Sequence, residues 1–358
     1  MPGTSLTRTS LTRTSRAAAA MLVAAAAVLA APAATAAPRG PLEPTAVPVS
    51  TVAAYPDGTF LESVAVGADG AAYVTVALDA RIDRVTPAGE VSTFAQFPAL
   101  GDGSLGFPPT GPSSIVGTVV IAPDSTLYAT YVNTAEPELS GVYSVTAQGR
   151  RLVTRLPEGS QPNGITVDRD GTIYVADSAL GLVWRARPGE AVVRAWVTDP
   201  LLAPTGNGFP GANGVKIFRG ALYVSNSGTA EVVRIPVRRD GSPGAPVTYA
   251  TGVPIDDFAF DVTGDIYGTT HPFDTVVRVG RDGTQEVVAG IPEGVVGPTA
   301  AAFGTVRGDR TSLYVVTDGG LFGRLIDPDA PTAPPGVFRL DVGIPGLPMP
   351  GTSPAHRG

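Results

Sequence analysis

The chain has 358 residues, among them 44 glycines, 35 prolines and no cysteine, and its formal charge at pH 7 is −7. An acidic chain whose single lysine is Lys216 has few cations to replace the counterions of phosphate groups, so we expect no nucleic-acid partner. Without cysteine the chain has no disulfide framework. Its length exceeds the usual size of one compact core, which requires either two domains or a repeat that extends one core.

The first 36 residues have the pattern of a cleaved secretory signal peptide. Three arginines precede an apolar run over residues 17–31, and the small residues 34–36 follow it. The run is too short for a stable membrane span. We therefore expect a leader over residues 1–36, a linker over 37–47, and a mature protein that is secreted to the extracellular space or the periplasm without membrane attachment.

A two-strand unit recurs six times along the rest of the chain. Each copy contains an alternating apolar strand, a Gly/Asp turn, and a second strand with a tyrosine. The six tyrosines, spaced 44 to 55 residues apart, are Tyr73, Tyr128, Tyr174, Tyr223, Tyr267 and Tyr314. A third strand follows every unit and a fourth follows most of them, whereas no helical period of useful length appears.

Six units of four strands predict an all-β fold, a six-bladed β-propeller over residues 48–343. The last unit lacks a fourth strand of its own, and residues 48–55 have the character of that strand. We expect this N-terminal strand to complete the last blade, because the pairing closes the ring and removes an exposed edge. Residues 344–358 are expected to form a flexible tail. A pair of β-sandwiches or a β-solenoid is the alternative fold.

One position, ten or eleven residues before the tyrosine in the first five units, lies just ahead of the innermost strand of a blade. The sixth unit carries an insertion, and aligning its Pro298 places Thr299 at this position. Equivalent residues there converge on the propeller axis, and they are Glu62, Gly117, Asn163, Asn213, Asp256 and Thr299. Two carboxylates that meet there would repel each other, and two buried carboxamides would lack hydrogen-bond partners, unless another group bound all four. A hard divalent cation supplies one, and calcium prefers such an all-oxygen set. Mg²⁺ and Mn²⁺ are alternatives, and Zn²⁺ is less favoured because no histidine or cysteine holds one of these positions.

Each of the four residues also has a simpler interpretation. Asn163 and Asn213 could adopt a positive φ in front of a glycine. Glu62 could be a solvated loop acid, and Asp256 could cap a turn. The metal site is favoured because all four residues occupy the same position of the repeat. A calcium ion that only stabilises the channel remains an alternative.

The stretches PNGITVDRDGTIYVADS (162–178) and TSLYVVTD (311–318) resemble the SMP-30/gluconolactonase/LRE-like family of six-bladed propellers. The order Glu, Asn, Asn, Asp also occurs in the related diisopropylfluorophosphatase and paraoxonases. The resemblance covers residues 48–342. It implies that Glu62, Asn213 and Asp256 bind the metal. It further implies that Asn163 orients the substrate or a metal-bound water and that Asp256 also serves as general base.

The resemblance and the ligand set together imply hydrolysis of a small-molecule lactone or activated ester. The cation would polarise the carbonyl, and Asp256 or, less favoured, Asp257 would take a proton from the attacking water. Asp257 departs from the family pattern, which has glycine there, and is a candidate for substrate binding. His271 is a weaker one; His356 lies in the tail, and we expect neither histidine to be essential.

Two rival functions remain open at this stage. The first is a non-catalytic exported binding module with a structural calcium ion, and the second is a strictosidine-synthase-like or lyase propeller, which does not require this ligand set. A lactone, an ester and a phosphotriester are all compatible substrates. We expect a monomer.

Overall fold

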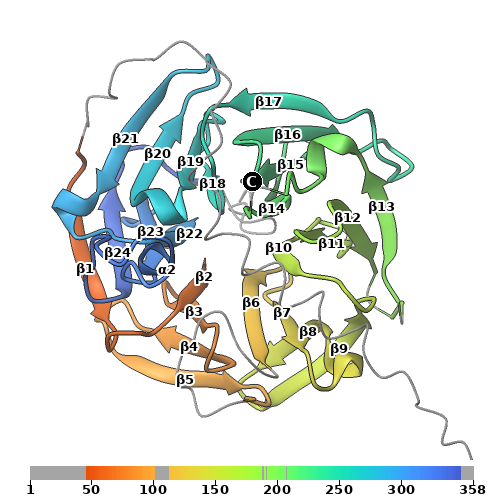
Figure 1. Ribbon diagram of the computed structural model, residues 1–358, viewed down its shortest axis with the longest axis horizontal. Helices are drawn as coiled ribbons and strands as arrows, with labels where there is room; N and C mark the ends of the chain where they lie inside the picture. Colours follow the sequence, from red (N-terminus) through yellow and green to blue (C-terminus); the bar gives the residue numbers. More distant parts are fainter. Residues whose placement is uncertain (1–45, 101–112, 188, 191, 207, 348–358) are drawn as a thin grey trace, which may run out of the picture.

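The computed structural model describes residues 46–100, 113–187, 189–190, 192–206 and 208–347, so the predicted leader and His356 lie outside the described residues. Six four-stranded antiparallel sheets surround a common axis (Figure 1), which confirms the predicted six-bladed propeller. None of the helices in the described part of the chain has the length and apolar character of a membrane-spanning segment.

Blades one to three are built from consecutive strands, numbered outward from the axis. Their strands are β2 (Leu61–Val66), β3 (Ala72–Val76), β4 (Arg81–Val85), β5 (Val91–Gln96), β6 (Ser114–Ile121), β7 (Leu127–Asn133), β8 (Gly141–Thr146), β9 (Gly149–Arg155), β10 (Pro162–Val167), β11 (Ile173–Asp177), β12 (Leu182–Ala186) and β13 (Arg194–Thr198).

Blades four and five follow the same order, and blade six combines both ends of the propeller. Their strands are β14 (Ala212–Phe218), β15 (Ala221–Asn226), β16 (Glu231–Pro236), β17 (Val247–Thr251), β18 (Phe258–Phe260), β19 (Ile266–Thr269), β20 (Thr275–Val279), β21 (Gln285–Gly290), β22 (Pro298–Phe303), β23 (Ser312–Thr317), β24 (Gly336–Asp341) and β1 (Val49–Ala54). The short helices are η2 (Pro137–Leu139), η3 (Pro200–Leu202), η4 (His271–Phe273), η5 (Ile291–Glu293) and α2 (Gly323–Ile326).

The ring is closed by β1, which pairs antiparallel with β24, as predicted. Val49 lies opposite Leu340 and Ala54 opposite Gly336. The backbone amide of Tyr55 extends the pairing by donating to the Pro335 carbonyl oxygen at 2.8 Å. Because β1 is the outermost strand of blade six, it covers the edge that β24 would otherwise expose.

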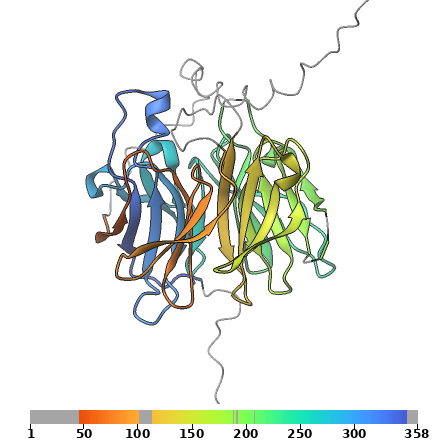
Figure 2. The same cartoon turned by 90° about the horizontal axis from the view of Figure 1, so that it is seen from below.

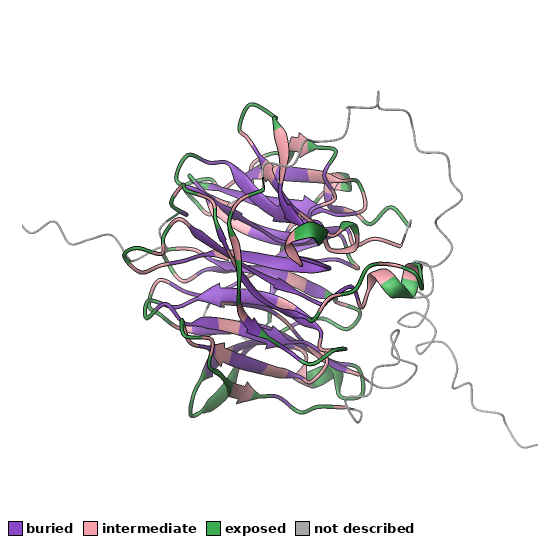
Figure 3. Cartoon of the chain, turned by 90° about the vertical axis from the view of Figure 1, so that its left-hand side faces the viewer, coloured by how far each residue is buried: buried purple, intermediate pink, exposed green. Residues whose placement is uncertain are grey.

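The core consists of six apolar clusters, and each lies between two neighbouring blades (Figure 3). The repeated tyrosine explains this regularity, because the ring of each copy packs into the interface with the next blade. Five of these rings are buried, and that of Tyr73 is partly buried. Tyr174 of blade three, for example, packs with Leu222 and Val224 of blade four. The repeat in the sequence is therefore a repeat of interfaces between blades.

The predicted axial position lies at a β-bulge. It is the second residue of the innermost strand in blades one, three, four and six, and it precedes the strand in blade five. The strand register shifts at Glu62, and again between Pro162 and Ile165 and between Ala212 and Val215. In blade five the Asp256 amide donates to the Thr269 carbonyl at 2.7 Å, while the Thr269 amide donates to the Asp257 carbonyl at 2.9 Å, so two residues oppose one. A bulge re-aims the side chain of its extra residue, which explains how these positions depart from the alternation of the strand.

Asn163-Gly164 therefore belongs to a bulge and not to a hairpin turn. Neither Asn163 nor Asn213 has a positive φ, so the interpretation of these residues as left-handed turn residues is wrong. The glycines have a packing role instead. A Cβ atom on Gly164 would lie 2.4 Å from the Asn213 carbonyl oxygen, and one on Gly214 would lie 2.8 Å from the Asp256 carbonyl oxygen.

The end of the propeller domain differs from the predicted flexible tail. Residues 345–347 run from blade six onto blade five, where the Val262 amide donates to the Pro345 carbonyl at 3.0 Å and the Leu347 amide to the Phe260 carbonyl at 2.9 Å. These backbone bonds hold the segment against blade five, so the predicted boundary at residue 344 is too early. Residues 348–358 of the predicted tail lie outside the described residues.

Replacing Gly164 by alanine should lower the free energy of unfolding by about 1–3 kcal/mol, because the new methyl group would overlap the backbone of blade four. Gly323→Ala in α2 is the matched control: its Cβ would meet only Ala330 at 3.5 Å, and alanine favours a helix. Urea unfolding of both variants, followed by tryptophan fluorescence, measures the difference. Equal stability of the two variants would contradict the close packing at the axis.

Candidate functional site

The four predicted site residues lie on four different blades, at the same end of the innermost strands. Glu62 is in β2, Asn163 in β10 and Asn213 in β14, and Asp256 lies just before β18. Asn213 and Asp256 are buried, with 2% and 8% exposure, whereas Glu62 and Asn163 are half-buried. The shared bulge gives the four side chains equivalent positions around the axis.

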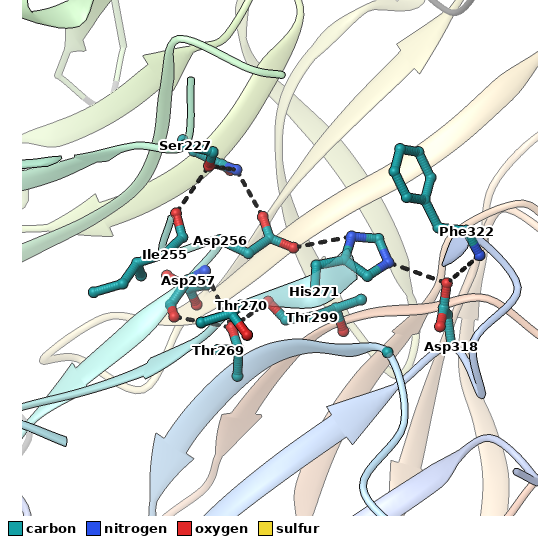
Figure 4. A network of polar contacts seen from close by, with 12 residues as sticks. Ser227, Ile255, Asp256, Asp257, Thr269, Thr270, His271, Thr299, Asp318 and Phe322 are labelled. Atoms are coloured by element: carbon teal, nitrogen blue, oxygen red, sulfur yellow. Dashed lines mark hydrogen bonds and ion pairs between the residues drawn. The ribbon is translucent and has the colours of Figure 1, made fainter. Parts of the chain in front are cut away.

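The structure joins Asn213 and Asp256 directly. The Asn213 Nδ2 donates to Asp256 Oδ1 at 2.7 Å and to Ser227 Oγ at 2.9 Å. Ser227 in turn donates to the Ile255 carbonyl oxygen at 2.8 Å (Figure 4). The Asn213 Oδ1 is buried and has no hydrogen-bond partner among the described residues. An acceptor left unpaired in this way costs about 1–3 kcal/mol, so this amide oxygen lacks a donor or a cation.

Glu62 belongs to the same electrostatic cluster. Burial raises the pKa of its carboxyl well above the usual range, and the nearby Asp256 carboxylate raises it further, while His271 opposes the shift. The Asn163 side chain makes no hydrogen bond within the described part of the chain. Its amide is therefore available to a substrate or an ion, and its place in the set rests on the bulge that it shares with Asn213.

His271 bridges two carboxylates in this cluster, although it holds no repeat position before an innermost strand. Its Nδ1 lies 3.4 Å from Asp256 Oδ2 and its Nε2 lies 3.0 Å from Asp318 Oδ2 (Figure 4). Burial disfavours the imidazolium, but Asp318 and Asp256 outweigh it and raise the pKa of His271 well above 6.5. The residue has a φ of +27°, an unfavourable backbone conformation for a histidine. Sequence position alone placed His271 among the weaker candidates.

Asp318, which the sequence analysis missed, holds His271 in place. It is buried and follows β23, and its carboxylate accepts hydrogen bonds from the backbone amides of Gly320 at 2.7 Å and Phe322 at 2.8 Å. The only signal in the sequence is an acid at the end of the second strand of a blade. Asp177, the last residue of β11, carries a similar signal in blade three, but its carboxylate accepts hydrogen bonds from the Trp184 indole and from backbone amides and has a structural role.

Asp256 and Asp257 have different partners although they are neighbours in sequence. Asp257 Oδ1 lies 2.5 Å from Nζ of Lys216, and this ammonium group also lies 5.7 Å from the centre of the Phe258 ring. Burial raises the pKa of Asp257, while Lys216 opposes the shift. Asp257 is thus neutralised by a cation of the protein, and Asp256 is the acid that faces Asn213 and His271.

The charges of the cluster and its oxygen atoms fit a divalent cation. If the four acids Glu62, Asp256, Asp257 and Asp318 were all ionised, the ammonium of Lys216 and a protonated His271 would leave two negative charges uncompensated. Burial and this repulsion between acids raise the pKa of Glu62, and a divalent cation would remove the repulsion. Within the described residues, no group of three or more His, Cys, Asp or Glu side chains could hold a metal. A cation here would therefore need amide oxygens as well, and the unpaired Asn213 Oδ1 is one. Such a ligand set suits calcium better than zinc.

No protein-family model matches the chain. A relative from a Phoma species, described as a candidate hetero-Diels-Alderase, is 25% identical over 302 residues, which are 73% of this chain and 84% of the relative.

Solved structures with the same fold include a gluconolactonase from Xanthomonas campestris, with a TM-score of 0.58 and 16% identity over 87% of this chain and 99% of its own. A calcium-binding regucalcin from Agrobacterium tumefaciens has a TM-score of 0.58 and 16% identity, over 85% and 97% of the two chains. A virginiamycin B lyase from Staphylococcus aureus has a TM-score of 0.53 and 13% identity, over 82% and 99%. The first two are consistent with the resemblance to the SMP-30/gluconolactonase group, and at these identities the likeness shows the fold alone.

Lys216→Met should lower the free energy of unfolding by about 3 kcal/mol, because it leaves the Asp257 carboxylate buried without a cation. The double variant Lys216→Met/Asp257→Asn should recover most of this loss, since the uncompensated charge is removed. Arg84→Met is the control, because the Arg84–Asp69 pair is more exposed and contributes at most about 1 kcal/mol. Urea unfolding at neutral pH measures all three, and an equal loss in the single and double variants would contradict the ion-pair role.

Proposed function

We propose that this protein is an exported, divalent-cation-dependent hydrolase of a lactone or activated ester. The observation that carries the proposal is the contact between Asn213 and Asp256, which leaves a buried amide oxygen unpaired beside a cluster that would carry two excess negative charges if fully ionised. The N-terminal pattern of a signal peptide supports export. The fold that the chain shares with a gluconolactonase supports the reaction class.

In this proposal Glu62, Asn163, Asn213 and Asp256 would hold the cation, with calcium preferred. A bound calcium ion supplies positive charge that polarises the substrate carbonyl. Two carboxylates supply the negative charge of the set, and the two asparagines supply neutral oxygen ligands. Asn163 has the further role of orienting the substrate or the attacking water, because its amide is not used by the protein.

Asp256 is the acid placed to accept a proton from water. Its Oδ1 receives the Asn213 amide, and its Oδ2 faces His271, so both oxygens are held in fixed directions. Asp318 fixes the other side of the imidazole. Asp257 is less suited to this step, because Lys216 already stabilises it in the charged form.

A second candidate function is catalysis of a hetero-Diels–Alder cycloaddition, and the relative from Phoma is the observation that favours it. Such a reaction joins a diene to a partner double bond and requires neither a nucleophile nor a base. The protein needs only to orient the two reactants and to activate a carbonyl by charge or by hydrogen bonding. A protonated His271 or a bound cation would suffice for this activation. A binding module with a structural calcium ion is the non-catalytic alternative.

Glu62→Gln tests the cation site through stability alone. With a chelator present, the variant should be at least as stable as the wild type, because one of several mutually repelling buried carboxylates is removed. Calcium at about 100 times its Kd should stabilise the wild type by about 2.7 kcal/mol and the variant far less. Asp282→Asn, at an exposed turn, should respond to calcium like the wild type. If calcium stabilised Glu62→Gln as much as the wild type, Glu62 would not be a ligand.

The catalytic roles are tested with a panel of small lactones and esters, assayed with calcium and with a chelator. Asp256→Asn should lower kcat by about 100-fold or more, since it removes the proton acceptor and one ligand charge. Asn163→Ala should reduce activity more than calcium affinity. Mass spectrometry of the products separates the two enzymatic functions, because hydrolysis adds one water to a single substrate and cycloaddition joins two reactants without water. Calcium binding without turnover of any substrate would favour the binding module.

A further inference from the structure

Two phenylalanines enclose the imidazole of His271. The Phe322 ring centre lies 4.9 Å from that of His271, and the Phe60 ring centre lies 5.7 Å away in an edge-on arrangement. Phe60 directly precedes β2, and Phe322 follows β23, so the two rings come from different blades. The His271 imidazole therefore lies against two apolar rings as well as between the carboxylates of Asp256 and Asp318.

A second aromatic pair lies two residues from His271 in the chain. Phe273, the last residue of η4, is 53% exposed. Its ring stacks on Phe209, with the ring centres 6.1 Å apart and an angle of 17° between their planes. Phe209 belongs to the connection from β13 to β14, which is the connection that leads into Asn213. We call Phe60, Phe209, Phe273 and Phe322 the aromatic wall.

Other exposed apolar side chains belong to the same end of the propeller. Figure 2 shows η4 and α2 at one end, where the chain also enters each innermost strand. The connections at this end carry the exposed residues Leu180 (43%), Ile291 (48%) and Leu325 (37%). Single exposed apolar residues are normal on a protein surface, but an exposed aromatic ring two residues from His271 is typical of a binding site for apolar groups.

Five charged groups of the cluster are paired with one another, which leaves Glu62, Asn163 and the Asn213 Oδ1 for the proposed cation and the reacting carbonyl. His271 is paired with Asp318 and Asp256, and Lys216 is paired with Asp257. A polyhydroxylated substrate would place several hydroxyl groups against the aromatic wall, where each would lose its hydrogen bonds to water without replacement. An apolar substituent gains free energy in the same place through burial and ring contacts.

From these observations, and on the basis of the proposed function, we infer that the substrate carries an apolar substituent, alkyl or aromatic, beside its reactive ester group. This substituent binds against the aromatic wall, with Phe273 as its most exposed contact. A sugar-acid lactone is correspondingly a poor substrate. The specificity thus resides in the connections before β2, between β13 and β14, after β19 and after β23, and the polar cluster supplies the chemistry.

The test compares δ-nonalactone with glucono-δ-lactone, two six-membered lactones that differ in their substituents. For the wild type with calcium, kcat/KM should be at least about tenfold higher for δ-nonalactone, the gain expected from burying an alkyl chain. Phe273→Ala should lower kcat/KM for δ-nonalactone about five- to tenfold, as expected for the loss of one ring contact. Val247→Ala, in the outer strand β17, is the control, because Val247 is similarly exposed at 48% and should have no effect.

A preference for glucono-δ-lactone, or equal effects of Phe273→Ala and Val247→Ala, would overturn the inference. If neither lactone is hydrolysed, the proposed hydrolase function fails, and binding of δ-nonalactone is then measured by calorimetry with a chelator present. Binding that Phe273→Ala weakens and Val247→Ala does not would still support the apolar binding site. No binding, or binding that is the same in both variants, would overturn it.

Discussion

The structure depends on the close approach of six innermost strands around one axis. Each strand begins with a bulge, and glycines such as Gly164 and Gly214 allow the backbone of one blade to touch that of the next. Hydroxyl groups then bond across the blades, as where Thr299 donates to the Leu61 carbonyl at 2.7 Å and Thr269 to the Thr299 carbonyl at 2.8 Å. This backbone contact fixes the positions of the side chains at the bulges. The geometry of the site is therefore determined by how closely the innermost strands pack around the axis.

The same convergence creates an electrostatic problem at the site. Blades one, five and six bring four acids into one cluster, and the protein compensates only part of their charge. Lys216 neutralises Asp257 and His271 lies between Asp256 and Asp318, whereas Glu62 has no cation of the protein as a close partner among the described residues. Partial compensation limits the cost of burying these acids and leaves the negative charge that the proposed cation would balance.

Much of the fold could be predicted because equivalent positions of the six units can be aligned on the repeated tyrosine. The tyrosine marks each interface between blades, and its offset to the axial position identifies Glu62, Asn163, Asn213 and Asp256 from the sequence alone. The role of His271 and Asp318 could not be predicted in this way. They lie in connections of individual length, and Asp177 shows that an acid at the end of the second strand also serves a purely structural purpose. The ion pair between Asp257 and Lys216 could not be predicted either, because Lys216 belongs to another blade.

The pairing of β1 with β24 also determines the order in which the propeller can be completed. Val49 and Leu340 are joined across almost the whole length of the ring, so their contact carries a large loop-closure cost. The first strand of the domain to be synthesised must remain unpaired until the last one is available. Blades one to five can form from local hairpins, and blade six is then the slow, cooperative step. Loss of either end of the domain opens the same blade, although the two ends are farthest apart in the sequence.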